Sequence, residues 1–149
     1  MPIAELAAIE REPLMRVWIF QTGEPLPVGG ALARPMRAMN IAHALNLSGH
    51  DVVIWSSDFS HTEKQHVYGT DTKLRVSDNL EVRLIHTRGY KRNIGLSRLV
   101  DHAQMAMRLR HLLKFEDPPD IAFVGFPPIE PAAVMINWLN RFSVPTLLD

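Results

Sequence analysis

The sequence predicts an α/β fold with a doubly wound parallel sheet of the Rossmann-like kind, and three observations support this class. Apolar runs of strand length alternate with segments in which apolar residues recur every three or four positions. The runs are apolar at consecutive positions, which is typical of parallel strands covered on both faces. The 149 residues are 46% hydrophobic and 21% charged and include no cysteine, so one globular domain without disulfides or thiolate metal sites is expected.

The N-terminal part of the chain has the pattern of a βαβ unit. A strand is predicted at 16–21, followed by a loop at 22–34 whose glycines and prolines exclude both helix and strand. A helix is predicted over 36–48, and Gly49 stands where a left-handed C-cap is expected. The next strand, at 52–55, is therefore parallel to the first.

The rest of the chain continues this alternation. The polar residues 56–79 have no sustained period, and a connection of this length is either functional or partly disordered. Residues 1–15 are interpreted as a leader or a short helix ahead of a domain over 16–149. The remaining predicted elements are a strand at 82–85, a basic loop at 86–97, a helix at 96–115, a strand at 121–124, a helix at 131–142 and a strand at 144–148.

The charges balance over the whole chain but not locally. Sixteen Lys and Arg residues match sixteen Asp and Glu residues, which by itself argues against nucleic acid or an acidic membrane as partner. Residues 86–115, however, contain seven cations against Asp101 alone, a local net charge of +6. The apolar runs are too short for a membrane span and the N-terminus lacks the pattern of a signal peptide, so the expected location is the cytoplasm.

The loop at 22–34 contains the first candidate ligand site. Gly29 and Gly30 leave backbone N–H groups open just before a helix, an arrangement that suits a phosphate or a carboxylate, although a plain flexible turn is the alternative. Their spacing matches neither the dinucleotide fingerprint nor the Walker loop. Arg34 opposes the helix dipole, which an anionic ligand or a nearby carboxylate would explain; a solvated arginine is the alternative.

The sequence gives little support for a metal site or for catalytic carboxylates or serines. The histidines have no metal-ligand spacing, so no metal site is predicted. Asp58, Asp71 and Asp78 lie in the polar loop, with no apolar setting to raise a pKa, and no G-x-S-x-G nucleophile elbow occurs. The catalytic residues are therefore left unassigned.

The helix at 96–115 has two faces with apolar residues. The broader face is predicted to pack on the sheet and contains Leu96, Leu99, Val100, Ala103, Ala106, Met107 and Leu113. Met105, Leu109 and Leu112 are predicted to lie opposite, with Arg98 and Arg108 near them, as a ridge for an anionic bilayer surface. The alternative is that another element covers this ridge.

Several segments together resemble a known family. The segment LNLSGHDV at 45–52, preceded by Ile41 and Ala42, is similar to the pattern LAxxLxxxGHxV in the N-terminal domain of family 4-like glycosyltransferases of GT-B architecture. The subgroup that builds bacterial surface polysaccharides, such as O-antigen, capsule and lipopolysaccharide, is similar in further segments. These are Phe59-Ser60-His61, Tyr90 to Asn93 with Gly95, Pro119-Asp120-Ile121 with Pro127-Pro128, and Val144 to Leu148. The Gly29-Gly30 pair, followed by a helix, is similar to the family as a whole.

The resemblance implies that 16–149 is the acceptor-side half of a retaining, hexosyl-type transferase. The nucleotide sugar would be a substrate, with no cofactor and no metal, and the acceptor would be a saccharide or a lipid-linked sugar at the inner face of the membrane. Gly29, Gly30, Arg34, Tyr90, Lys91 and Asn93 would line the cleft. The loop at 125–128 lacks the histidine that many members carry there. Because the donor domain is absent, the chain is expected to be a fragment that is inactive by itself.

Two further interpretations stay open. A non-catalytic Rossmann-like module would use the glycines as a turn and the basic helix to dock a protein. A nucleotide-sugar epimerase fragment would share the two-domain architecture and differ in its product.

Overall fold

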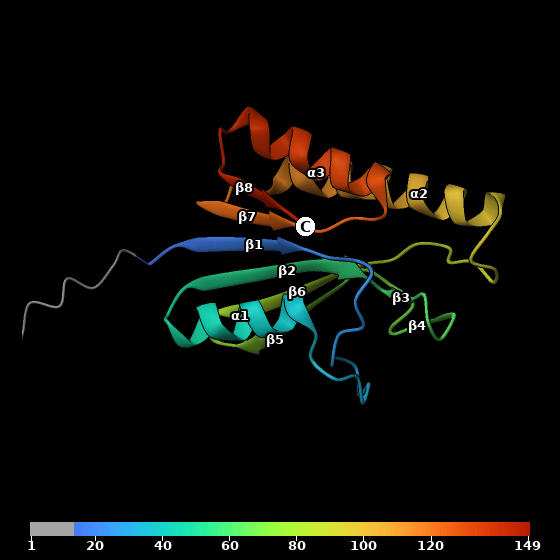
Figure 1. Cartoon of the computed structure of the whole chain (residues 1–149), viewed down its shortest axis with the longest axis horizontal. Helices are drawn as coiled ribbons and strands as arrows, with labels where there is room; N and C mark the ends of the chain where they lie inside the picture. Colours follow the sequence, from blue (N-terminus) through green and yellow to red (C-terminus); the bar gives the residue numbers. More distant parts are fainter. Residues whose placement is uncertain (1–13) are drawn as a thin grey trace, which may run out of the picture.

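The structure, a computed structural model, describes residues 14–149, so most of the predicted leader at 1–15 lies outside the described residues. A six-stranded sheet of order β5-β6-β2-β1-β7-β8 lies between α1 on one face and α2 and α3 on the other (Figure 1). The strands of this sheet are β1 (Arg16–Phe20), β2 (Asp51–Ser57), β5 (Thr72–Ser77), β6 (Leu80–Ile85), β7 (Ile121–Val124) and β8 (Thr146–Leu148). The helices are α1 (Arg37–Leu47), α2 (Leu96–Leu112), the short 3-10 helix η2 (Leu113–Phe115) and α3 (Ile129–Arg141).

All neighbouring strands are parallel except β5, which runs antiparallel to β6. The two central strands are the predicted apolar runs: β1 pairs with β2 in the register Val17 with Val52 to Phe20 with Trp55. The mixed α/β, Rossmann-like fold is thus confirmed. None of the described helices is long and apolar enough to cross a membrane.

Alternate residues of β1, β2 and β7 face two separate cores, as the period of two in a strand requires. Trp18 packs on the α2–α3 side, its ring 5.2 Å from both Trp55 and Trp138, edge-on to the first and stacked on the second. On the other side Ile19 and Ile54 are completely buried under α1. Both faces of β1 are therefore apolar, which explains its uninterrupted hydrophobic run.

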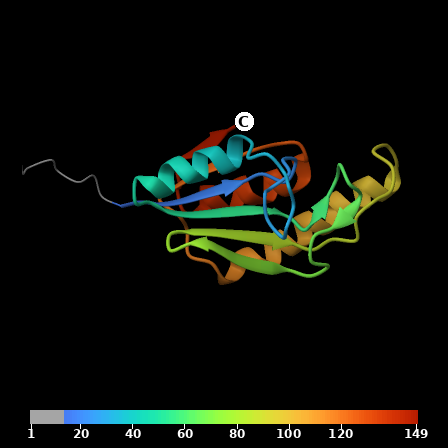
Figure 2. The ribbon, with the colours of Figure 1, turned by 90° about the horizontal axis from the view of Figure 1, so that it is seen from below.

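The polar segment 56–79 is more structured than its sequence suggests. It forms a small hairpin of β3 (Phe59–Ser60) and β4 (Gln65–His66), and then the edge strand β5. Figure 2 shows this hairpin beside the N-terminal end of α2. Asp58, which the sequence places in a polar loop, is completely buried at the end of β2, where backbone N–H groups and His86 surround its carboxylate.

The face of α2 that packs against the core is opposite to the face that was predicted. Met105 and Leu109 are 3% and 0% exposed and belong to the core, Leu112 packs against that core, and Leu96 is 80% exposed. The first turns of α2 extend past the sheet (Figure 1), so the apolar residues at this end have no sheet to cover. The prediction that Met105, Leu109 and Leu112 form a membrane-facing ridge is wrong.

The two arginines assigned to that ridge have other neighbours. Arg98 is half-buried and lines a pocket at the end of the sheet. Arg108 forms an ion pair with Asp71, from Nη2 to Oδ2 at 2.5 Å. Neither guanidinium belongs to an apolar ridge.

Candidate ligand-binding site

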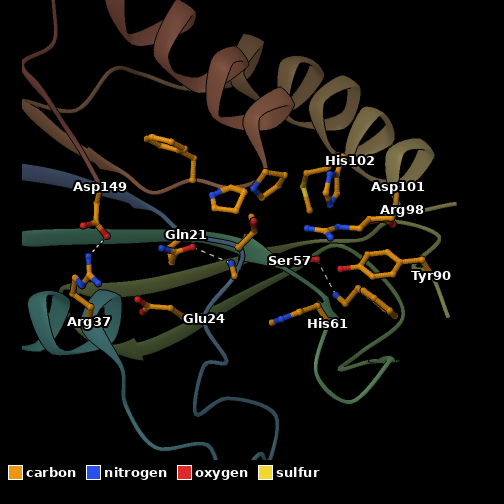
Figure 3. A pocket seen from close by; sticks show the side chains of 17 residues that line it. Gln21, Glu24, Arg37, Ser57, His61, Tyr90, Arg98, Asp101, His102 and Asp149 are labelled. Atoms are coloured by element: carbon orange, nitrogen blue, oxygen red, sulfur yellow. Dashed lines mark hydrogen bonds and ion pairs between the residues drawn. The ribbon is translucent and has the colours of Figure 1, made fainter. Parts of the chain in front are cut away.

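A pocket of about 380 Å³ opens at the carboxyl edge of the sheet. Here the loops after β1, β2, β6 and β7 meet the N-terminal part of α2 (Figure 3). Ligands of open parallel sheets bind beyond the carboxyl ends of the strands, so the fold places its site here. The lining residues are Gln21, Thr22, Gly23, Glu24, Arg37, Ser57, Phe59, His61, Tyr90, Arg98, Asp101, His102, Met105, Phe126, Pro127, Pro128 and Asp149.

The loop after β1 is fixed by its own side chains. The Gln21 side chain is buried and its Oε1 accepts the backbone N–H of Gly23 at 2.9 Å. Glu24 reaches the start of α1, where its Oε2 accepts the N–H of Ala38 at 2.8 Å. Because Met36, the N-cap residue, supplies no side-chain bond, Glu24 caps the helix and occupies the positive end of its dipole.

The predicted glycine site is not part of this pocket. Gly29, Gly30 and Arg34 are exposed and do not line it. Gly29 has φ +65°, and a Cβ there would lie 2.4 Å from the Val67 side chain. The close approach of the loop to Val67 and Tyr68 explains this glycine without a ligand.

Arg98 is the cation that faces the pocket from α2. Its Nη1 donates to the carbonyl of Asn93 at 2.7 Å. Its Nε is buried and has no hydrogen-bond partner within residues 14–149. In Figure 3 the guanidinium lies beside Tyr90 and His102, at the inner wall of the pocket. An unpaired buried donor of this kind suits the oxygen of an anionic ligand.

The two histidines of the pocket are held in the neutral form. Burial, with the charges of Lys64 and Arg98, lowers the pKa of His61. Burial also lowers the pKa of His102, which Glu130 raises in part and Arg98 lowers further. Burial raises the pKa of Tyr90, so its phenol keeps its proton. At neutral pH these groups can therefore exchange hydrogen bonds with hydroxyl groups, while Arg98 carries the positive charge.

The Tyr90 wall is held between α2 and the β3–β4 hairpin. Asp101 is 5% exposed and its Oδ1 accepts the N–H of Gly89 at 2.8 Å. A Cβ on Gly89, whose φ is +72°, would lie 2.6 Å from the ring of Phe59. The rings of Phe59 and Tyr90 lie 5.0 Å apart, and Lys64 Nζ lies 4.6 Å above the Tyr90 ring. The wall thus offers aromatic surface next to polar groups.

The basic loop is divided between the pocket and the surface. Tyr90 lines the pocket as expected from the resemblance, whereas Lys91 is exposed and outside it. Asn93 supports the wall indirectly, since its side chain accepts from Lys64 and its carbonyl accepts from Arg98.

The sequence did not identify the α2 residues of the site. Asp101 and His102 lie three and four positions after Arg98, and Met105 lies four and three positions after them, so the four residues share one helix face. One signal was available in the sequence. Asp101 lies at the helical spacing of Met105 and Leu109, the buried residues of α2, and a buried Asp needs a hydrogen-bond partner.

The acidic side chains of the pocket already have partners. Asp101 accepts the Gly89 N–H, Glu24 caps α1, and Asp149 forms an ion pair with Arg37. With these carboxylates engaged and Arg98 facing the pocket, the arrangement is suited to binding a polar anion.

Comparison with known proteins supports the fold and no further conclusion. No protein-family model matches the sequence, and no curated protein matches it. A crystal structure of the C-terminal domain, residues 78–226, of a hydrogenase from Pyrococcus furiosus is similar, with a TM-score of 0.51 and 16% identity over 92% of this chain and 98% of that one. A second structure of that domain, residues 83–215, has a TM-score of 0.51 and 15% identity, over 92% and 95%.

These comparisons contradict the assignment to the GT-B glycosyltransferases. The similar structures belong to a hydrogenase domain, and no family model supports a glycosyltransferase. At this level of identity the likeness is one of fold, which many unrelated functions share. The function must therefore be argued from the pocket.

Proposed function

We propose that the carboxyl-edge pocket binds a phosphorylated, hydroxyl-rich ligand such as a nucleotide sugar, and that the domain contributes this site to a nucleotide-sugar-dependent transferase. The observation that carries the proposal is Arg98, whose buried Nε has no partner within residues 14–149 and whose side chain lines the pocket. A phosphate oxygen would supply the missing acceptor.

The other lining groups support the same class of ligand. Gln21, Ser57 and the neutral His61 and His102 offer hydrogen bonds of the kind that sugar hydroxyls form. Phe59 and Tyr90 add aromatic surface against which a ring can pack. Together the lining residues combine Arg98, a second arginine (Arg37) that is ion-paired with Asp149, several neutral polar groups and an apolar wall.

A non-catalytic binding module is the second candidate. The observation in its favour is that the three acidic groups of the pocket are engaged with Gly89, Ala38 and Arg37. Incubation with a nucleotide sugar and saccharide acceptors separates the candidates: a transferase releases the nucleotide and forms a glycoside, an epimerase isomerises the sugar, and a binding module does neither.

The binding proposal is tested with UDP-glucose, glucose 1-phosphate and glucose as probes in calorimetric titrations. Arg98→Gln should weaken binding of the two phosphorylated probes about 10- to 100-fold, because a charge-assisted hydrogen bond contributes about 1.5–3 kcal/mol. Arg110→Gln is the matched control: an exposed arginine on the same helix that does not line the pocket. Equal affinity of the two variants, or unchanged affinity in Arg98→Gln, would overturn the assignment.

We also propose a cytoplasmic location with peripheral contact to the inner face of an anionic membrane. The support is the tip at 91–96, which consists of the end of the loop before α2 and the first residue of that helix. Here Lys91 and Arg92 are exposed, and Ile94 and Leu96 are 89% and 80% exposed. Basic residues next to apolar ones are typical of surfaces that meet anionic lipid. If the acceptor is linked to a lipid, the pocket must lie next to the membrane surface, which is also where this tip would make contact.

A further inference from the structure

A cluster of two histidines and one aspartate lies beside the pocket and outside its lining. Asp58 follows β2, His66 belongs to β4 and His86 follows β6. One ligand atom from each lies within 4.8 Å of the other two. His66 lies eight residues after Asp58, and His86 lies twenty residues after His66, so neither interval is one of the short ligand spacings typical of zinc motifs.

The buried carboxylate is held in place by the chain around it. Asp58 is completely buried. Its Oδ1 accepts the N–H of Tyr68 at 2.8 Å, and its Oδ2 accepts the N–H of Gly69 at 3.0 Å. Oδ2 also lies 3.0 Å from His86 Nδ1. The backbone bonds orient the carboxylate toward the two imidazoles.

The imidazoles are oriented as well. His66 Nε2 lies 2.6 Å from the carbonyl of Thr87, so Nε2 carries the proton and donates, while Nδ1 keeps its lone pair. The rings of His66 and His86 lie only 4.6 Å apart at 41°. Histidines of metal sites characteristically donate one ring N–H to a carbonyl or carboxylate, which fixes the ring and leaves the other nitrogen for the metal.

We propose that Asp58, His66 and His86 bind a divalent transition-metal ion, with Zn²⁺ as the best match. Imidazole nitrogens with one carboxylate oxygen favour Zn²⁺ over Mg²⁺ and Ca²⁺, which prefer oxygen ligands. The metal replaces the proton between His86 Nδ1 and Asp58 Oδ2. Zinc bonds of about 2 Å in tetrahedral geometry put two ligand atoms about 3.3 Å apart, close to the 3.0 Å of that contact.

A metal at this cluster would act on the neighbouring pocket. His66 packs against Phe59 with ring centroids 5.3 Å apart, and Phe59 packs against Tyr90 at 5.0 Å. Phe59 and Tyr90 both line the pocket. The ion would join the β3–β4 hairpin to the end of β6 and fix the aromatic wall. The proposal does not depend on the identity of the pocket's ligand.

The test is a calorimetric titration of the full chain, free of affinity tags and treated with a chelator, with ZnCl₂. One ion per chain should bind, and His66→Gln and His86→Gln should each lower the affinity at least about 10-fold. Glutamine keeps an N–H donor for the Thr87 carbonyl or the Asp58 carboxylate, so both variants should keep the wild-type circular dichroism spectrum. His43→Gln and His111→Gln, both exposed and outside the cluster, are the matched controls and should bind like wild type.

A second measurement keeps the proposal open to refutation if a variant folds poorly. Zn²⁺ should raise the thermal midpoint of the wild-type chain and slow amide hydrogen exchange in the hairpin at 59–66, because an ion that binds only the folded state stabilises it. MgCl₂ should do neither. Absence of stoichiometric Zn²⁺ binding, an equal effect of Mg²⁺, or unchanged affinity in both cluster variants would overturn the site.

Discussion

Single residues decide how the pocket wall is built, and Gly89 shows this most directly. It adopts φ +72°, donates its N–H to the buried Asp101, and approaches the Phe59 ring so closely that a Cβ would lie 2.6 Å from it. We expect Gly89→Ala to lower the free energy of unfolding by about 2–5 kcal/mol, since strain in the left-handed region adds to overpacking. Urea denaturation measures the change.

Gly30 provides the matched control for this prediction. Its φ is +79°, and apart from its two chain neighbours no described residue has an atom within 4 Å of the position that a Cβ would take. Gly30→Ala should therefore show the backbone strain alone, about 1–2 kcal/mol. If the two variants lose the same stability, the close packing of Gly89 on Phe59 contributes nothing.

Among the elements, α2 contributes to both the core and the site, because Met105 on its buried face belongs to the core and also lines the pocket. Met105 is 3% exposed and Met107 is 67% exposed, since residues two positions apart on a helix point to nearly opposite sides. We expect Met105→Ala to lower the free energy of unfolding by about 2–5 kcal/mol, because it leaves a cavity between helix and sheet. Met107→Ala should stay within about 0.5 kcal/mol of wild type. Chemical denaturation of both variants gives the comparison, and a larger loss in Met107→Ala would restore the orientation predicted from the sequence.

The same helix shows why the sequence predicted some elements and missed others. The runs of β1 and β2 are apolar on both faces because helices cover both, so their sequence alone identifies them. Which face of α2 is buried depends on where the sheet ends, and no local sequence pattern indicates that position. The strand β5 lies at the edge of the sheet, where Leu74 alternates with exposed Lys73 and Arg75. Because of these charged residues the segment was interpreted as part of a polar loop.

The candidate site was predictable only in its position. The rule that ligands bind at the carboxyl edge placed the pocket, whereas the glycines chosen for it lie elsewhere. Asp58, His66 and His86 come together only because β2, β4 and β6 end near one another. To predict contacts between elements that are distant in the sequence, one must know the order of the strands in the sheet. Hydrophobic periodicity predicts only the individual helices and strands.

Over the whole molecule, a formal net charge of zero conceals a separation of charge. Part of the basic block over 86–115 is neutralised by contacts such as that of Arg108 with Asp71. The loop tip at 91–96 keeps exposed Lys91 and Arg92 next to exposed apolar side chains, and it extends beyond the sheet at one end of the molecule (Figure 1). This tip is where our proposal places contact with an anionic membrane.

We expect the chain to sediment with vesicles that contain phosphatidylserine and to be released in 1 M salt, where the screening length falls to about 3 Å. The double variant Lys91→Gln/Arg92→Gln should bind about 30-fold more weakly, since each cation near an anionic surface contributes about 1 kcal/mol. Arg110→Gln/Arg141→Gln removes the same charge from the C-terminal ends of α2 and α3 and should bind like wild type. Equal weakening in both double variants would show that net charge alone governs binding, and equal sedimentation with phosphatidylcholine vesicles would exclude an electrostatic contact at this tip.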